Sequence, residues 1–191
     1  RMSFYGHDRY EAKARVAEEI LRRRDRGEPF VAVEATTKRG IPASTFWGVA
    51  WGENLEAYSD YESRLPRGRT YLRGGNVYDL TIEEGEIFAY VTGQEIYEVL
   101  IRIEELPEEQ WGEIKQACAG EVGSLLDLLG GKLGPKVMEI MTRPEEGLFP
   151  SPREIHLSCS CPDWAEMCKH VAATLYAVGA KLDAEPELLF K

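Results

Sequence analysis

A group of thiol and imidazole side chains near the C-terminus carries the clearest chemistry in this sequence. Cys159 and Cys161 lie one residue apart, and after a gap of six residues Cys168 and His170 repeat that spacing. Three soft thiolates and one imidazole, arranged as two tight pairs, are the ligands that a tetrahedral zinc ion prefers. The sequence therefore predicts a Cys3His zinc site in which protein ligands fill all four positions, so that the metal is structural and not catalytic.

Other uses of these cysteines remain open at this point. A Cys-x-Cys pair also occurs as a redox pair or a disulfide, and Cys159 and Cys161 could form a thiol switch that releases zinc on oxidation. His156 is a conceivable alternative ligand. The second pair and the short gap favour zinc over these alternatives.

The local pattern indicates how the site is positioned. Residues 155–157 form a short β-type run before the first pair, and Pro162-Asp163 favours a turn that returns the chain toward it. From Cys168 onward the apolar residues follow helical spacing, at Val171, Leu175, Val178 and Leu182. We expect the first pair on a knuckle after a strand, and the second on the first turn of a helix.

This ligand pattern at a helix start resembles the SWIM-type zinc finger, in particular its bacterial and archaeal branch. The flanking residues that carry the resemblance are Pro162, Asp163, Trp164, Lys169, Val171 and Ala172, and upstream Trp47-Gly48, Trp51, Leu55-Glu56 and residues 65–71. It extends over residues 45–190 and leaves residues 1–40 unexplained. The resemblance implies a non-enzymatic binding module in DNA transactions, with a Swi/Snf-type helicase-like ATPase or a recombination factor as partner.

The composition is typical of a globular protein, with 43% apolar and 29% charged residues among 191. No apolar run approaches the ~20 residues of a membrane span, and the N-terminus has no signal-peptide core. With free thiols arranged for a metal, we expect a cytoplasmic protein with no membrane partner and no small-molecule substrate.

Charge is unevenly distributed along the chain, whose net charge is −10. Residues 1–40 carry ten Lys/Arg against seven Asp/Glu, whereas residues 76–150 carry five against sixteen. The acidic middle favours a protein partner over a polyanion. Its carboxylates also suggest an alternative function, a metal-dependent nuclease, although no partner base or nucleophile is evident.

Two basic stretches are candidate nucleic-acid contacts. Residues 8–26 are predicted to form a helix that ends in Arg22, Arg23 and Arg24, which suit either the helix dipole or phosphates. The second stretch, residues 64–75, is predicted to be a flexible loop entering a strand, where arginines interleaved with Tyr71 could follow a phosphate backbone or form ion pairs. Its arginines are Arg64, Arg67, Arg69 and Arg73.

The remaining pattern predicts an α+β fold. Residues 30–36 are predicted to form a strand, and residues 45–58 a helix whose aromatic residues fill the core. Residues 77–82, 87–91 and 96–103 form a three-stranded antiparallel meander. Further helices are expected after Pro107, over residues 121–129 and over residues 135–141, and the tail, residues 186–190, is expected to dock an apolar edge or a partner.

We accordingly expect an antiparallel meander packed with helices and closed by a Cys3His knuckle-helix module. The predicted parts are an N-terminal helix and strand at 1–40, an α+β body at 41–150 and the zinc module at 151–191. On this division, loss of the metal would loosen residues 155–185 and leave the sheet intact.

Overall fold

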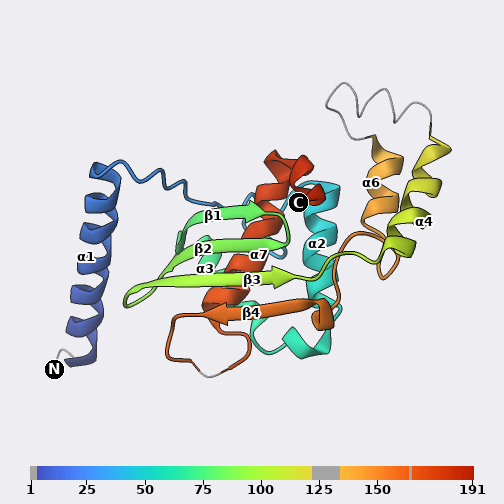
Figure 1. Ribbon diagram of the computed structural model, residues 1–191. Coiled ribbons are helices and arrows are strands. Elements are labelled where there is room, and N and C mark those ends of the chain that lie inside the picture. Colours follow the sequence, from blue (N-terminus) through green and yellow to red (C-terminus); the bar gives the residue numbers. More distant parts are fainter. Residues whose placement is uncertain (1–3, 122–133, 164) are drawn as a thin grey trace.

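A four-stranded antiparallel sheet forms the centre of the computed structural model, which describes residues 4–121, 134–163 and 165–191 (Figure 1). Its strands, in spatial order, are β1 (Val77–Glu83), β2 (Glu86–Thr92), β3 (Ile96–Ile103) and β4 (Ile155–Cys159). The predicted meander is confirmed. The predicted strand before the first cysteine pair is also present, and it joins the sheet as a fourth strand beside β3, with Val99 opposite Cys159.

Helix α7 (Lys169–Ala184) packs across one face of this sheet and is the central helix of the fold (Figure 1). Leu175 and Tyr176 are 0% and 1% exposed, and they share one core with inward-facing sheet residues such as Val99 and Ile101. A helix that is apolar nearly all round is typical of a fully buried position. The second ligand pair therefore lies at the start of the most buried helix among the described residues.

Two helices hold α7 from the side away from the sheet: α2 (Phe46–Glu56) and α3 (Leu65–Arg73). A glycine at each contact lets the backbone of α2 or α3 lie close to that of α7. A Cβ atom at Gly68 of α3 would lie 2.6 Å from the carbonyl carbon and the Cβ of Ala172, and one at Gly48 of α2 would lie 2.7 Å from the Gly179 carbonyl oxygen. Backbones in such contact leave no room for a larger side chain.

Helix α2 is further tied to α7 by polar contacts. The indole nitrogens of Trp47 and Trp51 donate to the carbonyls of Leu182 and Leu175, at 2.6 and 2.7 Å, which confirms these aromatic residues as core. Burial raises the pKa of Asp183, but hydrogen bonds from Thr36 and from the hydroxyl and amide groups of residues 44–45 outweigh it and hold that pKa below its usual range.

The remaining helices lie at the two ends of the sheet (Figure 1). Helix α1 (Phe4–Asp25) is at the end where β2 turns into β3, and it confirms the predicted N-terminal helix. At the other end α4 (Glu108–Ala119) and α6 (Pro135–Met141) pack on each other through a small core of Ile114, Val137 and Met141. The predicted helix 121–129 lies almost wholly outside the described residues.

Short 3-10 turns complete the chain: η1 (Ser59–Tyr61), η2 (Pro152–Glu154) and η3 (Pro186–Phe190). Leu188 and Leu189 of η3 pack against the main core, so the tail docks on an apolar edge as expected. No helix among the described residues combines the length and the apolar character that a membrane crossing requires.

Two local predictions were wrong. Residues 30–36 form no strand: the Val33 amide donates to the Val77 carbonyl at 3.0 Å, but the Val31 amide donates to the Asp79 side chain, next to a register irregularity in β1 that interrupts further pairing. Residues 64–75 are not a loop but mainly helix α3, because Leu65, Gly68 and Leu72 share one face that packs on α7.

Candidate metal centre

The four predicted ligands occupy fixed positions at the junction of β4 and α7. Cys159 is the last residue of β4, and Cys161 follows it at the start of the returning loop. Cys168 is the N-cap of α7, where its sulfur accepts a hydrogen bond from the Val171 amide at 3.4 Å, and His170 is the second residue of the helix. Strand pairing positions one pair and the buried helix positions the other.

The four ligand atoms lie close enough together to bind one metal ion. All four lie within 4.8 Å of one another, and His170 Nδ1 is 3.9 Å from Cys159 Sγ and 3.7 Å from Cys168 Sγ. Tetrahedral zinc, with Zn–S of about 2.3 Å and Zn–N of about 2.0 Å, separates its sulfur and nitrogen ligands by about 3.6 Å. The donor set and its spacing therefore fit zinc, with His170 ligating through Nδ1.

The pKa of one ligand thiol, Cys168, is lowered, whereas those of Cys159 and Cys161 are raised, the first mainly by its hydrogen bond to Cys168 and the second by burial. Hydrogen bonds from the Cys159 thiol, the His170 ring and the Val171 amide lower the pKa of Cys168 to about 4, against the opposing effect of burial. A helix N-terminus stabilises a thiolate in this way, and the thiolate is the form that binds a metal. Among the ligands, the Cys168 thiolate is thus favoured chiefly by its neighbour Cys159, with smaller contributions from His170 and from the helix that it caps.

Two tyrosines hold the His170 ring in place. His170 is only 4% exposed; the Tyr97 ring lies 4.4 Å from it, and the Tyr71 ring lies 5.5 Å away in an edge contact. Its Nε2 is buried without a hydrogen-bond partner among the described residues, and it faces Gly93 in the turn between β2 and β3. Solvent therefore cannot approach the ligand ring from that side.

Substituting Gly93 by alanine is expected to lower zinc affinity about tenfold. The new Cβ would lie 2.8 Å from the Tyr97 ring and 3.2 Å from His170 Nε2, so it would displace the ligand ring. Changes in the shell around metal ligands typically cost 10–100-fold in affinity. Competition with a chromophoric chelator measures the effect, and Gly120→Ala, where the nearest atom lies at 4.0 Å, is the matched control. Equal affinities for the two variants would contradict this role of Gly93.

All four predicted ligands are brought together, and His156 is not. Its Nε2 lies 2.9 Å from a Glu104 carboxylate oxygen, toward the other end of β4. In the part of the chain that the structure describes, Cys159, Cys161, Cys168 and His170 are the one group of three or more His, Cys, Asp or Glu side chains close enough to hold an ion. The acidic middle segment forms no comparable carboxylate site within those described residues.

Most arginines of the two basic stretches already have partners within the protein. Three of the four arginines in residues 64–73 have partners inside the protein: Arg64 pairs with Asp163 at 3.4 Å, Arg69 with Glu56 at 3.3 Å, and Arg73 donates to the carbonyls of Thr37 and Gly40. Arg67 is exposed. In α1, Arg22 and Arg23 pair with Glu18 and Glu19, and Arg23 also lies over the Tyr90 ring; Arg24 is exposed.

Sequence reasoning missed the residues that enclose the ligand histidine. Tyr71, Gly93 and Tyr97 come from α3, a turn and β3, and no spacing in the chain connects them with the cysteines. Two local features could have indicated them: the Gly93-Gln94 turn, and the position of Tyr97 among the alternate residues of β3 that face the core.

The fold and this site define an α+β protein with a Cys3His metal centre. Residues 145–179 match the family model of the SWIM zinc finger, so the chain contains that domain. The chain is also similar to the uncharacterized protein Rv2102 of Mycobacterium tuberculosis, with 33% identity over 157 residues, which are 81% of this chain and 56% of that protein. It thus spans about half the length of this relative. No solved structure matches the chain.

Proposed function

We propose that this protein is a non-enzymatic zinc-binding adaptor that contacts a protein partner in DNA transactions. The observation that carries the proposal is the complete ligand set: three sulfurs and one imidazole nitrogen within 4.8 Å of one another. Four protein ligands leave a tetrahedral zinc ion no position for an activated water or a substrate. The zinc then serves to hold a surface in shape.

The surface held in this way is the loop between the ligand pairs and the start of α7. Zinc would join the end of β4 to the N-terminus of α7, which fixes the exposed residues Pro162, Asp163 and Glu166 between them. Within this loop Met167 packs in the main core and Asp163 pairs with Arg64, and the zinc cross-link would add a second fixed point at its start. The metal thereby presents a defined loop and helix end to a partner.

The resemblance to SWIM-type proteins supports a Swi/Snf-type helicase-like ATPase or a recombination factor as the partner. The acidic surface of residues 76–150 also favours a protein over a polyanion at that face. Reduced thiols that ligate zinc fit the cytoplasm. The alternative, a metal-dependent nuclease, needs two or three carboxylates around one ion, and we expect no DNA cleavage with Mg²⁺ or Mn²⁺.

Affinity purification from cells tests the adaptor role. The wild-type chain should recover a specific ATPase or recombination factor, and chelator treatment or His170→Ala should abolish the recovery. Because His170→Ala also affects folding, Glu166→Lys on the exposed loop serves as a second variant that leaves the ligands in place. Recovery of the same partners with and without metal and with both variants would overturn the proposal.

Direct DNA contact is a finer proposal, and its strongest candidate is the end of α1. Replacing Arg22 and Arg24 by glutamine is expected to lower DNA affinity. The slope of log affinity against log salt concentration should also become shallower by about one for each phosphate contact that is lost. Arg69→Gln is the control, since its side chain is only 30% exposed, against 62% for Arg22. Fluorescence anisotropy against salt concentration measures both. Undetectable binding by the wild type at about 0.1 M salt would rule out a direct DNA contact.

A further inference from the structure

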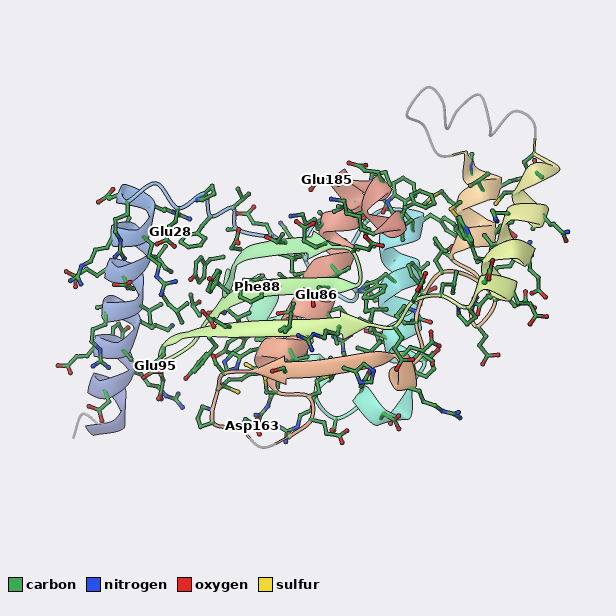
Figure 2. The ribbon with its side chains drawn as sticks, in the orientation of Figure 1. Glu28, Glu86, Phe88, Glu95, Asp163 and Glu185 are labelled. Carbon is green, nitrogen blue, oxygen red and sulfur yellow. The ribbon has the colours of Figure 1, made fainter. Side chains whose placement is uncertain are left out.

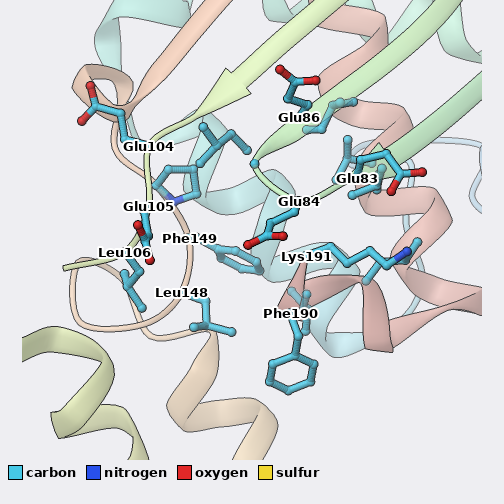
Figure 3. Close-up of a pocket in the computed structure, with 18 of the residues that line it drawn as sticks. Glu83, Glu84, Glu86, Glu104, Glu105, Leu106, Leu148, Phe149, Phe190 and Lys191 are labelled. Atoms are coloured by element: carbon cyan, nitrogen blue, oxygen red, sulfur yellow. The ribbon is translucent and has the colours of Figure 1, made fainter. Parts of the chain in front are cut away.

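A second site lies at the opposite end of the sheet from the metal centre. A pocket of about 650 Å³ opens between the β1–β2 turn, the end of β3, the η3 tail, Trp111 of α4 and residues 148–150 (Figure 3). Its volume falls in the range of pockets that enclose a ligand, about 300–1,000 Å³. Val178 and Leu182 of α7 contribute to its wall, so the helix that carries His170 also reaches this pocket, about 18 Å further along its axis.

The interior of the pocket is apolar. Trp51, Phe149 and Leu182 come from the main core, and Leu106, Trp111 and Leu148 from the smaller one, so the pocket lies between two packed clusters. Leu106, Trp111 and Leu148 are only partly buried. An apolar hollow with partly exposed walls is a typical position for the anchoring side chain of a partner.

The edge of the pocket is strongly acidic. Figure 3 shows the carboxylates of Glu84 and Glu105 close to the apolar side chains of Leu106, Leu148 and Phe149, whereas the Glu104 carboxylate points away from them. The lining contains six carboxylates: Glu83, Glu84, Glu86, Glu104, Glu105 and Glu154. Lys191 is the one lysine or arginine among the described lining residues, and the pairs of Glu104 with His156 and Glu86 with Arg102 are largely exposed.

We propose that this pocket binds a basic, amphipathic peptide segment of the protein partner, with an apolar side chain in the hollow and Lys or Arg on the acidic edge. The proposal rests on the adaptor function and adds the chemistry of the segment that is recognised. Charge complementarity selects a cationic occupant and repels a phosphate backbone, whereas the apolar interior supplies the affinity. The zinc-held loop and this pocket would then form two contacts joined by one rigid helix.

A model peptide tests the pocket chemistry directly. The probe is a fluorescein-labelled amphipathic peptide of Leu and Lys, compared with a counterpart that carries Glu at every Lys position. At about 0.1 M salt the wild type should bind the Lys peptide at least tenfold more tightly than the Glu peptide. Glu84→Lys/Glu105→Lys should weaken binding of the Lys peptide about tenfold. Leu106→Ala should weaken it several-fold even at about 1 M salt, where edge charges are screened.

The matched control is Glu95→Lys/Glu98→Lys. It makes the same change in net charge at exposed positions near the other end of the sheet, where Figure 2 labels Glu95. Its effect should be less than twofold. Equal losses for the two double variants, or no loss for either, would overturn the pocket proposal. So would self-association that only Glu84→Lys/Glu105→Lys abolishes, since a second copy of this chain would then be the occupant.

Zinc content separates this proposal from the adaptor function. The three variants change no ligand and no contact of His170, so each should retain the same zinc content as the wild type. If zinc-loaded protein captures its partner but does not bind the peptide, only the pocket proposal is overturned. If purified wild-type protein contains no zinc, the adaptor proposal is overturned, whether or not the peptide binds.

Discussion

His170→Ala, or removal of the metal by a chelator, is expected to unfold the whole protein cooperatively. Zinc contributes on the order of 10 kcal/mol to small structural sites, which is comparable to the roughly 5–15 kcal/mol that stabilises a typical domain. The ligand pair on α7 is continuous with a helix whose residues from His170 to Ala180 are all buried. Loosening the start of this helix therefore exposes the core that covers the sheet.

This expectation differs from the one that the sequence alone supports, in which residues 155–185 loosen and the sheet stays intact. The reason is that β4 pairs with β3, and α7 contributes Leu175, Tyr176 and Val171 to the same core as Val99 and Ile101. A separate zinc module would share few such contacts. Here a bound metal would cross-link two elements of the main core.

Hydrogen exchange measures the difference between these outcomes. After chelation, the amides of β2 and β3 should lose protection together with those of α7, in one cooperative transition. Cys118→Ser is a suitable control for thiol loss, because Cys118 packs in the separate α4–α6 cluster and is not a ligand. Persistent protection of Val99 and Ile101 in metal-free protein would show that the zinc module is independent of the sheet.

Gly68→Ala is expected to destabilise the protein by about 2–3 kcal/mol, although alanine is the better helix former. The added Cβ would lie 2.6 Å from the backbone of Ala172, so α3 must move away from α7. In a chain of this size, the loss corresponds to a fall in Tm of about 5–10 °C. Because α3 also carries Tyr71, which contacts His170, zinc affinity should fall as well.

The matched control is Gly112→Ala in α4, where a Cβ meets nothing within 4 Å. That substitution should raise stability by about 0.5–1 kcal/mol, since it removes the conformational freedom of a helical glycine. The double variant Gly68→Ala/Ala172→Gly should recover only part of the loss, because a backbone carbon of residue 172 is as close as its Cβ. Full recovery, or stabilisation by Gly68→Ala alone, would contradict the tight α3–α7 packing.

The metal site was predictable because its chemistry is local. Its four ligands lie within twelve positions, and the turn and helix start between them follow from Pro162-Asp163 and from the apolar spacing after Cys168. The meander was also predictable, since Glu84-Gly85 and Gly93-Gln94 mark its two turns and neighbouring strands pair with each other. Local signals of this kind need no knowledge of distant packing.

Other features depend on contacts between distant segments. Strand β4 joins β3 across more than fifty residues, and nothing in residues 155–159 specifies that neighbour. Helix α3 is rich in arginine, so its sequence did not indicate a buried face. Leu65, Gly68 and Leu72 form such a face because they pack on α7. The acidic pocket likewise needs several chain segments to assemble, although the charge imbalance of residues 76–150 indicated its character.

X-ray absorption spectroscopy at the zinc edge, on protein purified under reducing conditions, tests the central claim most directly. We expect one zinc ion per chain with three sulfur ligands at about 2.3 Å and one nitrogen ligand at about 2.0 Å, supplied by Cys159, Cys161, Cys168 and His170. Protein without zinc, or a coordination shell that includes an oxygen atom from water, would contradict a closed structural site.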